Sequence, residues 1–271
     1  MIKICAIDLD GTLFDERKYI SDENKKAIMK AEENGCKVVI ATGRPINGVM
    51  PVIKHLNLLK PDDYVICYNG AKVYSITTGN LIYASTLSGK DVKELYYESK
   101  KLNVYFHAFR KNEELVTDIA NPYTAVEETI NKLTATIIDF SKIDDNEEFL
   151  KCMMVGADED ITTAMKNLDQ RHYNQYCVVR SSKIFLEFLN KETNKGSALE
   201  NLANYLNVQQ NETMAIGDAG NDYAMIKYAG VGVAMANAYP EIKEIANYVT
   251  SSNEESGVAK AINLFVNDPL A

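Results

Sequence analysis

The sequence predicts an α/β fold whose parallel sheet is interrupted by an inserted α+β domain. In residues 1–82 and again in residues 190–271, apolar strand-like runs alternate with helical segments, which favours a parallel sheet. In residues 83–189, strand-like runs also follow one another directly, which is typical of an antiparallel sheet. An apolar fraction of 46% over 271 residues is enough for a sizeable core. We therefore expect one core made of the first and last segments, with the middle segment inserted between them.

The first core segment is expected to contain two helices and a hairpin. After the apolar run IKICAI, a helix is expected from the N-cap Ser21 to a stop at Gly35. A β-branched run then ends at residues 42–43, and Pro45 is well placed to open the next helix. Asn69-Gly70 lies between two strand-like arms, which predicts a hairpin with a type I′ turn.

The other two segments are assigned from the same patterns. In the insert we expect helices at 90–102, 122–133 and 160–168, and strands at 104–109, 114–117, 151–156, 176–181 and 184–190. In the last segment, Ser197 and Glu200 have capping-box spacing at the start of a helix. Short strands and helices then alternate to the end of the last segment.

Charge and cysteine content exclude several classes of function. The net charge of −9 makes nucleic acid or anionic lipid an unfavourable partner. The five cysteines show no CxxC spacing, so Cys5 and Cys36 are interpreted as buried small side chains in a reducing compartment. The sequence shows no signal-peptide pattern at its N-terminus and no apolar run of membrane-spanning length. We therefore expect a cytoplasmic protein without a nucleic-acid or membrane partner, either a monomer or a weak homodimer.

Four short turns share one chemical feature. Each lies at the end of a predicted strand or helix and combines carboxylates, hydroxyls or an amide with glycine. They are residues 8–12 (DLDGT), 42–44 (TGR), 194–196 (NKG) and 217–222 (GDAGND). Ligands of open parallel sheets bind at the carboxyl ends of the strands. If the strands concerned are neighbours, these turns converge on one crevice.

The residue types in these turns suit a metal ion and a phosphate. Two or three carboxylates together favour a hard divalent cation, most simply Mg²⁺. A lysine, a threonine hydroxyl, an asparagine amide and backbone N–H groups beside glycine suit a phosphate. A carboxylate beside both can attack phosphorus and form an aspartyl-phosphate, while the metal and Lys195 neutralise the developing charge.

Each turn taken alone also has a purely structural interpretation. Residues 8–12 could form an Asx turn with solvated acids, and residues 42–44 a strand-to-helix turn with a surface arginine. Lys195 could be a solvated lysine, although a positive charge is mildly unfavourable at a helix N-terminus. Residues 217–222 could form a turn that caps a helix. The presence of all four turns in this order favours one functional site.

With these motifs, the sequence resembles the haloacid dehalogenase superfamily, and within it the Cof-type sugar phosphatases with a C2B-type cap. DLDGTL, ATGR, NKG and GDAGND resemble the family's first to fourth motifs. The resemblance covers the whole chain, because the family's cap falls between the second and third motifs. It implies a Rossmann-like core of parallel strands, with residues 83–189 as the cap that determines substrate specificity.

The resemblance also implies roles for individual residues. Asp8 would be the nucleophile and a Mg²⁺ ligand. Asp10 would be the general acid and base, and its backbone carbonyl would be a further ligand. Asp218 would complete the protein's metal ligands, with Asp222 behind it. The residues implied to hold the phosphoryl group are Leu9 (through its backbone N–H), Thr42, Gly43, Lys195 and Asn221.

Two further positions of the motifs have less definite roles. Arg44 would lie near the substrate or pair with an acid of the core. Ala219 departs from the family pattern, where many relatives carry Ser, Gly or Asn, but it is not a required ligand.

The resulting hypothesis is a Mg²⁺-dependent phosphatase acting on small phosphorylated metabolites, with sugar phosphates as the expected class. The alternatives are a phosphotransferase or phosphomutase on the same fold, or a non-catalytic sensor of a phosphorylated ligand. A sensor would be expected to lack one of the motif acids or the motif lysine, and this chain retains them all. Product analysis with excess sugar acceptor would separate a phosphatase, which releases inorganic phosphate, from a phosphotransferase, which forms a new sugar phosphate.

The cap offers only general candidates for contact with the substrate. Its polar candidates are His107, Arg110, Lys111, Arg180 and Lys183. Tyr96, Tyr97 and Tyr105 follow apolar periods and are expected to pack internally, whereas His55 and His172 lie in polar surroundings and receive no role.

Overall fold

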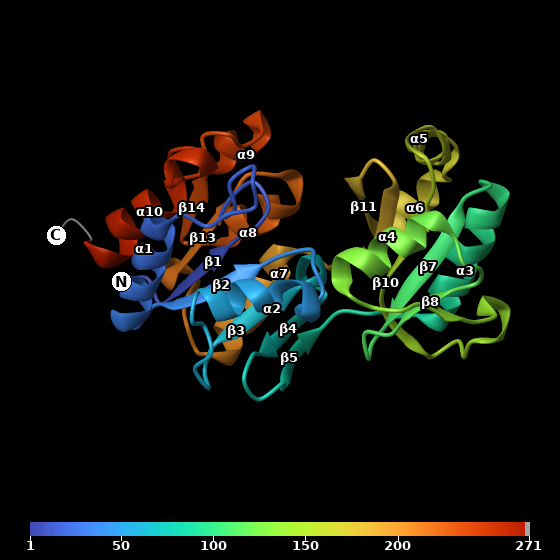
Figure 1. Cartoon of the computed structure of the whole chain (residues 1–271), viewed down its shortest axis with the longest axis horizontal. Helices are drawn as coiled ribbons and strands as arrows, with labels where there is room; N and C mark the ends of the chain where they lie inside the picture. Colours follow the sequence, from blue (N-terminus) through green and yellow to red (C-terminus); the bar gives the residue numbers. More distant parts are fainter. Residues whose placement is uncertain (269–271) are drawn as a thin grey trace. The chain divides into compact units, whose positions relative to one another are not determined.

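The computed structural model describes residues 1–268 and divides the chain into two compact units (Figure 1). The core unit comprises Met1–Tyr83 and the chain from Asn194 onward, and the second unit is Ala84–Thr193. The insert of the structure therefore ends four residues after the expected boundary at 189. The hydroxyl groups of Thr193 and Ser85 explain this, because they hydrogen bond at 2.6 Å and join the two ends of the insert.

The core sheet contains eight strands in the order β15-β14-β13-β1-β2-β3-β4-β5. Their bounds are β1 (Ile4–Ile7), β2 (Lys37–Ala41), β3 (Tyr64–Cys67), β4 (Lys72–Ser75), β5 (Leu81–Ala84), β13 (Thr213–Gly217), β14 (Val231–Ala234) and β15 (Tyr248–Val249). Neighbouring strands from β15 to β3 are parallel, which confirms the predicted sheet. Because β1 pairs with both β2 and β13, three of the four motif turns leave the carboxyl ends of adjacent strands.

The helices of the core begin largely where the sequence predicts. Their bounds are α1 (Asp22–Glu33), α2 (Ile46–His55), α7 (Lys195–Tyr205), α8 (Tyr223–Tyr228), α9 (Pro240–Ile245) and α10 (Gly257–Ile262). Short helical turns are η1 (Tyr68–Gly70), η3 (Gln210–Glu212), η4 (Gly220–Asp222), η5 (Asn253–Glu255) and η6 (Asn263–Asn267). Ser21 caps α1 as predicted, because its hydroxyl accepts the N–H of Asn24.

The start of α7 differs from the predicted capping box at Ser197 and Glu200. The N-cap is Asn194, whose side-chain oxygen accepts the N–H of Ser197 at 2.8 Å. The Ser197 hydroxyl is therefore part of the first helical turn, and the helix begins at Lys195. This earlier start places the motif lysine inside the helix.

The hairpin predicted around Asn69-Gly70 is present, but its turn is not of type I′. β3 and β4 are antiparallel, and the pairing of Cys67 with Lys72 leaves four residues in the connection. Three of these have positive φ, at 53° for Tyr68, 53° for Asn69 and 100° for Gly70. A two-residue turn contains only two such residues, so this connection is longer and more strained than predicted.

The insert is a mostly antiparallel sheet with helices packed on it, as expected, although its edge strands β8 and β9 pair in parallel. Its strands are β6 (Leu87–Ser88), β7 (Tyr105–Arg110), β8 (Leu115–Thr117), β9 (Thr136–Ile137), β10 (Glu148–Val155), β11 (Tyr176–Ser182) and β12 (Phe185–Asn190). Its helices are α3 (Gly89–Lys101), α4 (Pro122–Asn131), α5 (Asp158–Asn167) and α6 (Gln170–Gln175), with the short turn η2 (Phe140–Lys142). The strand order is β11-β12-β10-β7-β8-β9, and β6 pairs with β10. The apolar core of this unit lies between the sheet and helices that include α3 and α5.

Several single-residue expectations were only partly correct. Tyr96 packs against Phe106 and Phe140 as predicted, whereas Tyr97 and Tyr105 are exposed. His172 is buried, and its ring stacks on Tyr176.

The five cysteines are free, and all but Cys177 are buried. Over residues 1–268, none of the helices has the length and apolar content that crossing a membrane would need.

Candidate active site

A buried ion network joins the first, third and fourth motif turns. The ammonium group of Lys195, fully buried at the first position of α7, donates to Asp8 Oδ1 at 2.5 Å and to Asp222 Oδ1 at 2.7 Å. Asp8 follows β1 directly, and its backbone N–H donates to the carbonyl of Ile216 in β13. Because two carboxylates share one ammonium group, this network carries surplus negative charge.

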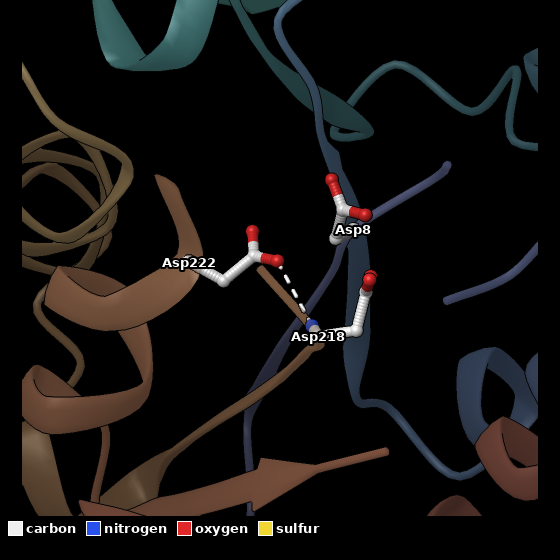
Figure 2. A group of neighbouring side chains, drawn as sticks. All are labelled: Asp8, Asp218 and Asp222. Carbon is white, nitrogen blue, oxygen red and sulfur yellow. Dashed lines mark hydrogen bonds between the residues drawn. The ribbon is translucent and has the colours of Figure 1, made fainter. Parts of the chain in front are cut away.

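Asp218 adds a third carboxylate beside this network. Oxygens of Asp8, Asp218 and Asp222 all lie within 4.8 Å of one another (Figure 2). The second oxygen of Asp222 accepts the backbone N–H of Asp218 at 3.0 Å and of Ala219 at 3.1 Å, so Asp222 fixes the turn that carries Asp218. Thr12 donates its hydroxyl to Asp218 Oδ1 at 2.6 Å.

The surplus charge appears in the pKa values of the carboxyl groups. Burial, the Asp222 carboxylate and other acids raise the pKa of Asp8 to about 8, although Lys195 opposes the shift. Burial is also the main cause that raises the pKa of Asp218 to about 6. For Lys195, burial favours the neutral form, but Asp222 and Asp8 more than compensate and raise its pKa. The ammonium group therefore remains charged, and the carboxylates are poised to bind additional positive charge.

The packing around Asp218 leaves no space for a side chain at Gly11. A Cβ atom at Gly11 would lie 2.6 Å from Asp218 Oδ2, and Gly11 has a φ of +89°. Glycine is therefore required by both the close approach and the left-handed backbone. This explains why the first motif turn places glycine directly after Asp10.

Asp10 has different partners from the buried network. Its carboxylate accepts two hydrogen bonds from Arg44, from Nε at 3.0 Å and Nη2 at 2.7 Å, and one from Lys18 at 2.7 Å. Partial burial raises the pKa of Asp10, but these hydrogen bonds and positive charges outweigh it and hold the pKa below its usual value. Asp10 is thus an ionised carboxylate, and Arg44 pairs with an acid of the core, one of the two positions expected for it.

The residues predicted to hold phosphate come together around the same turns. Thr42, at the end of β2, is buried, and its hydroxyl accepts the backbone N–H of Arg44 at 3.2 Å. Asn221 donates its side-chain amide to Asn69 Oδ1 at 3.1 Å, and a Cβ at Gly43 would lie 3.1 Å from the Asn69 carboxamide. Asn69 therefore connects the second and fourth motif turns.

Leu9 lies between the two acids of the first motif turn. Its side chain is fully buried, and its carbonyl accepts the N–H groups of Leu13 and Phe14. This closes the backbone behind Asp8 and Asp10 into a compact turn.

The sequence model of the haloacid dehalogenase-like hydrolase family matches residues 5–262, almost the whole chain. The chain belongs to this family. The match spans all four motif turns and the insert, so the insert is hereafter called the cap.

Relatives of known name cover the full length of the chain. The Bacillus subtilis protein YxeH is 39% identical over 275 residues, covering 98% of this chain and 99% of YxeH. The Bacillus subtilis 5-amino-6-(5-phospho-D-ribitylamino)uracil phosphatase YcsE is 34% identical and covers 98% of this chain and 96% of its own.

Solved structures give the same assignment. A haloacid dehalogenase-like hydrolase from Bacteroides thetaiotaomicron has a TM-score of 0.83 at 32% identity, covering 97% of this chain and 99% of its own. The subclass IIB sugar phosphatase BT4131 has a TM-score of 0.77 at 25% identity and covers 96% of this chain and 98% of its own. The protein is therefore a phosphatase of the haloacid dehalogenase-like family.

The polar cap residues suggested for substrate contact have partners within the cap. Their shortest contacts are Arg110–Glu147 at 2.7 Å, Lys111–Glu148 at 2.6 Å and Arg180–Asp158 at 2.6 Å, while Lys183 is exposed. His107 is fully buried and contacts Thr124 and Met153. Burial, and then the charge of Lys151, lower the pKa of His107 to about 3, so the imidazole is neutral near pH 7.

Three residues of the site were not recognised from the sequence. Thr12 belongs to the first motif, but its contact with Asp218 crosses 206 residues. Lys18 follows no pattern that distinguishes it from a surface lysine. Asn69 was recognised only as a turn residue, although asparagine next to glycine is a signal of a backbone with positive φ.

Proposed function

We propose that this phosphatase hydrolyses small phosphorylated metabolites, with sugar phosphates as the expected class, through an aspartyl-phosphate on Asp8. The observation that carries the proposal is the buried network of Asp8, Lys195 and Asp222, with Asp218 beside it. An excess of buried carboxylates is costly unless positive charge accompanies it. A divalent cation and a catalytic task explain this arrangement better than structural stability does.

The donor set fits Mg²⁺. The carboxylates of Asp8 and Asp218, together with the backbone carbonyl of Asp10, would hold the ion, and hard oxygen ligands of this kind are those that Mg²⁺ prefers. Asp222 is engaged with Lys195 and two backbone N–H groups, so its proposed role is to support these ligands. When bound, Mg²⁺ supplies positive charge next to the transferring phosphoryl group.

In the first half of the proposed reaction, a carboxylate oxygen of Asp8 attacks phosphorus. The bond from phosphorus to the leaving oxygen breaks, and the protonated form of Asp10 gives that oxygen a proton, which leaves Asp10 ionised. Lys195 neutralises negative charge on the phosphoryl group throughout. Leu9, Thr42, Gly43 and Asn221 are proposed to hold the phosphoryl oxygens.

In the second half, water attacks the phosphorus of the aspartyl-phosphate, and the bond between phosphorus and the Asp8 oxygen breaks. Asp10 takes up the proton of the water and is ready for the next cycle. The contacts of Asp10 with Arg44 and Lys18 support this half, because they keep the carboxyl group in the ionised form that accepts a proton.

Two relatives support the choice of substrate class. One is a sugar phosphatase, and the substrate named for the other carries a phospho-D-ribityl group. The substrates that these names give are phosphate monoesters of hydroxylated carbon chains, and the cap of this chain is proposed to determine which of them is accepted. The proposed partners are thus small phosphorylated metabolites rather than macromolecules.

The proposal is tested by turnover of p-nitrophenyl phosphate and then of a panel of phosphorylated metabolites. We expect activity that chelator abolishes and Mg²⁺ restores. Asp10→Asn should lower kcat at least ~100-fold, because general acid–base catalysis contributes this much. Mg²⁺ and phosphate should still raise the unfolding temperature of this variant, because it keeps the residues that bind them. Unchanged kinetics of Asp10→Asn would remove its acid–base role, and ligand binding without turnover across the panel would indicate a sensor.

Product analysis separates hydrolysis from transfer. In the presence of excess sugar, hydrolysis releases inorganic phosphate in proportion to substrate consumed. A new sugar phosphate formed in place of inorganic phosphate would instead identify a phosphotransferase.

A further inference from the structure

The connection between β3 and β4 is strained in a way that a simple hairpin does not require. Tyr68, Asn69 and Gly70 all have left-handed φ values, and all three residues are buried. An aromatic residue in this conformation is a clear outlier, and left-handed residues in sequence are rare outside glycine. Such strain persists only where the surrounding structure holds it, and it concentrates at functional sites.

The contacts of this turn explain what holds it. The N–H of Tyr68 donates to the carbonyl of Arg44, and the N–H of Asn69 donates to the carbonyl of Thr42 at 3.0 Å. A Cβ at Gly70 would lie 2.2 Å from the carbonyl oxygen of Asn194, so the turn packs directly against the start of α7. It therefore contacts the second and third motif turns through its backbone.

The side chain of Asn69 reaches the fourth motif turn as well. Its Oδ1 accepts the side-chain amide of Asn221 at 3.1 Å, and its carboxamide lies against Gly43. The amide of Asn221 can rotate freely unless a partner holds it, and a fixed donor binds an anion better than a mobile one. Asn69 is the residue that holds this donor.

We propose that Asn69 is a positioning residue of the phosphate site, which fixes the side chain of Asn221 and the backbone at Gly43. The inference rests on the proposed function, because it takes these two residues to contact the phosphoryl group. Asparagine suits the position for two reasons: it tolerates the left-handed backbone, and it supplies an oxygen acceptor to Asn221. Glycine would satisfy only the first requirement, and most other residues would satisfy neither.

The experiment compares Asn69→Gly with the wild type, using inorganic phosphate as a competitive inhibitor. Glycine keeps the left-handed backbone and removes the whole side chain, including the carboxamide. We expect the inhibition constant of phosphate and the KM of the substrate to rise about tenfold, while the Mg²⁺ concentration at half-maximal activity changes less than twofold. The matched control is Asn57→Gly, an exposed asparagine with φ of 59° after α2, for which all three quantities should equal those of the wild type.

A double-mutant cycle tests whether Asn69 acts through Asn221. In the Asn221→Ala background, adding Asn69→Gly should weaken phosphate binding by clearly less than it does in the wild type, because only its effect through Gly43 remains. An inhibition constant within twofold of the wild type for Asn69→Gly would overturn the inference, as would effects that multiply in the double variant.

Two arrangements keep the test decisive. If Asn69→Gly does not fold, Asn69→Ala replaces it, since alanine also removes the acceptor for Asn221. Phosphate inhibition should then weaken at least tenfold, and unchanged inhibition would overturn the inference. A wild-type protein that shows neither turnover nor inhibition by phosphate would overturn the proposed function itself, whereas normal wild-type inhibition with an unaffected Asn69 variant overturns only this inference.

Discussion

Replacing Asp8, the proposed nucleophile, should make the metal-free protein more stable while abolishing its activity. In the buried network, Asp8 and Asp222 share the single charge of Lys195. Asp8→Asn removes the surplus charge, keeps the size of the side chain and keeps an oxygen that can accept from Lys195. The variant should therefore unfold at a higher temperature than the wild type in the presence of chelator.

The magnitude follows from the pKa of Asp8, which is raised from 3.8 to about 8. Since each pKa unit corresponds to ~1.4 kcal/mol, the ionised group opposes folding by ~6 kcal/mol at most. Relaxation and water penetration around buried charges reduce such costs, so we expect a gain on the order of 2 kcal/mol, or a rise in Tm of about 5 °C.

The pH dependence of stability gives a second test of whether ionised Asp8 opposes folding. A carboxyl group whose pKa is higher in the folded than in the unfolded chain binds its proton more tightly when folded. Its ionisation therefore costs nothing below about pH 4, and the cost grows as the pH rises towards 8. The difference in stability between Asp8→Asn and the wild type should be larger at pH 8 than at pH 5.

The assay is thermal unfolding in chelator at both pH values, with Asp222→Asn as the matched control. Asp222 accepts hydrogen bonds at both oxygens, from Lys195 and from two backbone N–H groups, and an amide can replace only one of these acceptors. The control should therefore lose ~1–3 kcal/mol although it carries the same chemical change. Saturating Mg²⁺ should narrow the difference in unfolding temperature between the wild type and Asp8→Asn. A metal-free Asp8→Asn protein no more stable than the wild type at pH 8 would refute the reasoning.

Two further predictions concern the groups around the first motif turn. Burial raises and the Arg44 and Lys18 contacts lower the pKa of Asp10, so Arg44→Met should raise it. Where hydrolysis of the aspartyl-phosphate limits turnover, the acid limb of the kcat profile should then move to higher pH, because the ionised Asp10 that accepts the proton of the water is lost at higher pH; a limb that stays in place contradicts the role of Arg44. Gly11→Ala would place a Cβ 2.6 Å from Asp218, so half-maximal activity should need at least ~10 times more Mg²⁺. Gly35→Ala, at φ of +83° with no neighbour within 4 Å, should lose ~1 kcal/mol of stability without changing the Mg²⁺ requirement, and equal Mg²⁺ effects in both variants would count against the explanation.

Much of the architecture follows from local patterns that the sequence carries directly. The helix from Ser21 to Gly35 needs only a capping hydroxyl, a helical period and a glycine that accepts positive φ, and it forms as predicted. The predicted start of α7 at Ser197 was wrong, because Asn194 and Ser197 both offer a capping oxygen. The choice between them depends on tertiary contacts there, including the close approach of Gly70 to Asn194.

The sequence by itself determined the two-part α/β organisation, the family and the chemical types gathered in the four motif turns, because strand and helix patterns and the motifs are local. Only the tertiary structure decided how these groups share charge. Lys195 meets an acid 187 residues away, and Arg44 meets one 34 residues away. Asn69 likewise joins Asn221 across 152 residues. Burial, pKa and hydrogen-bond partnership depend on distances in space, and no local pattern of residues encodes those distances.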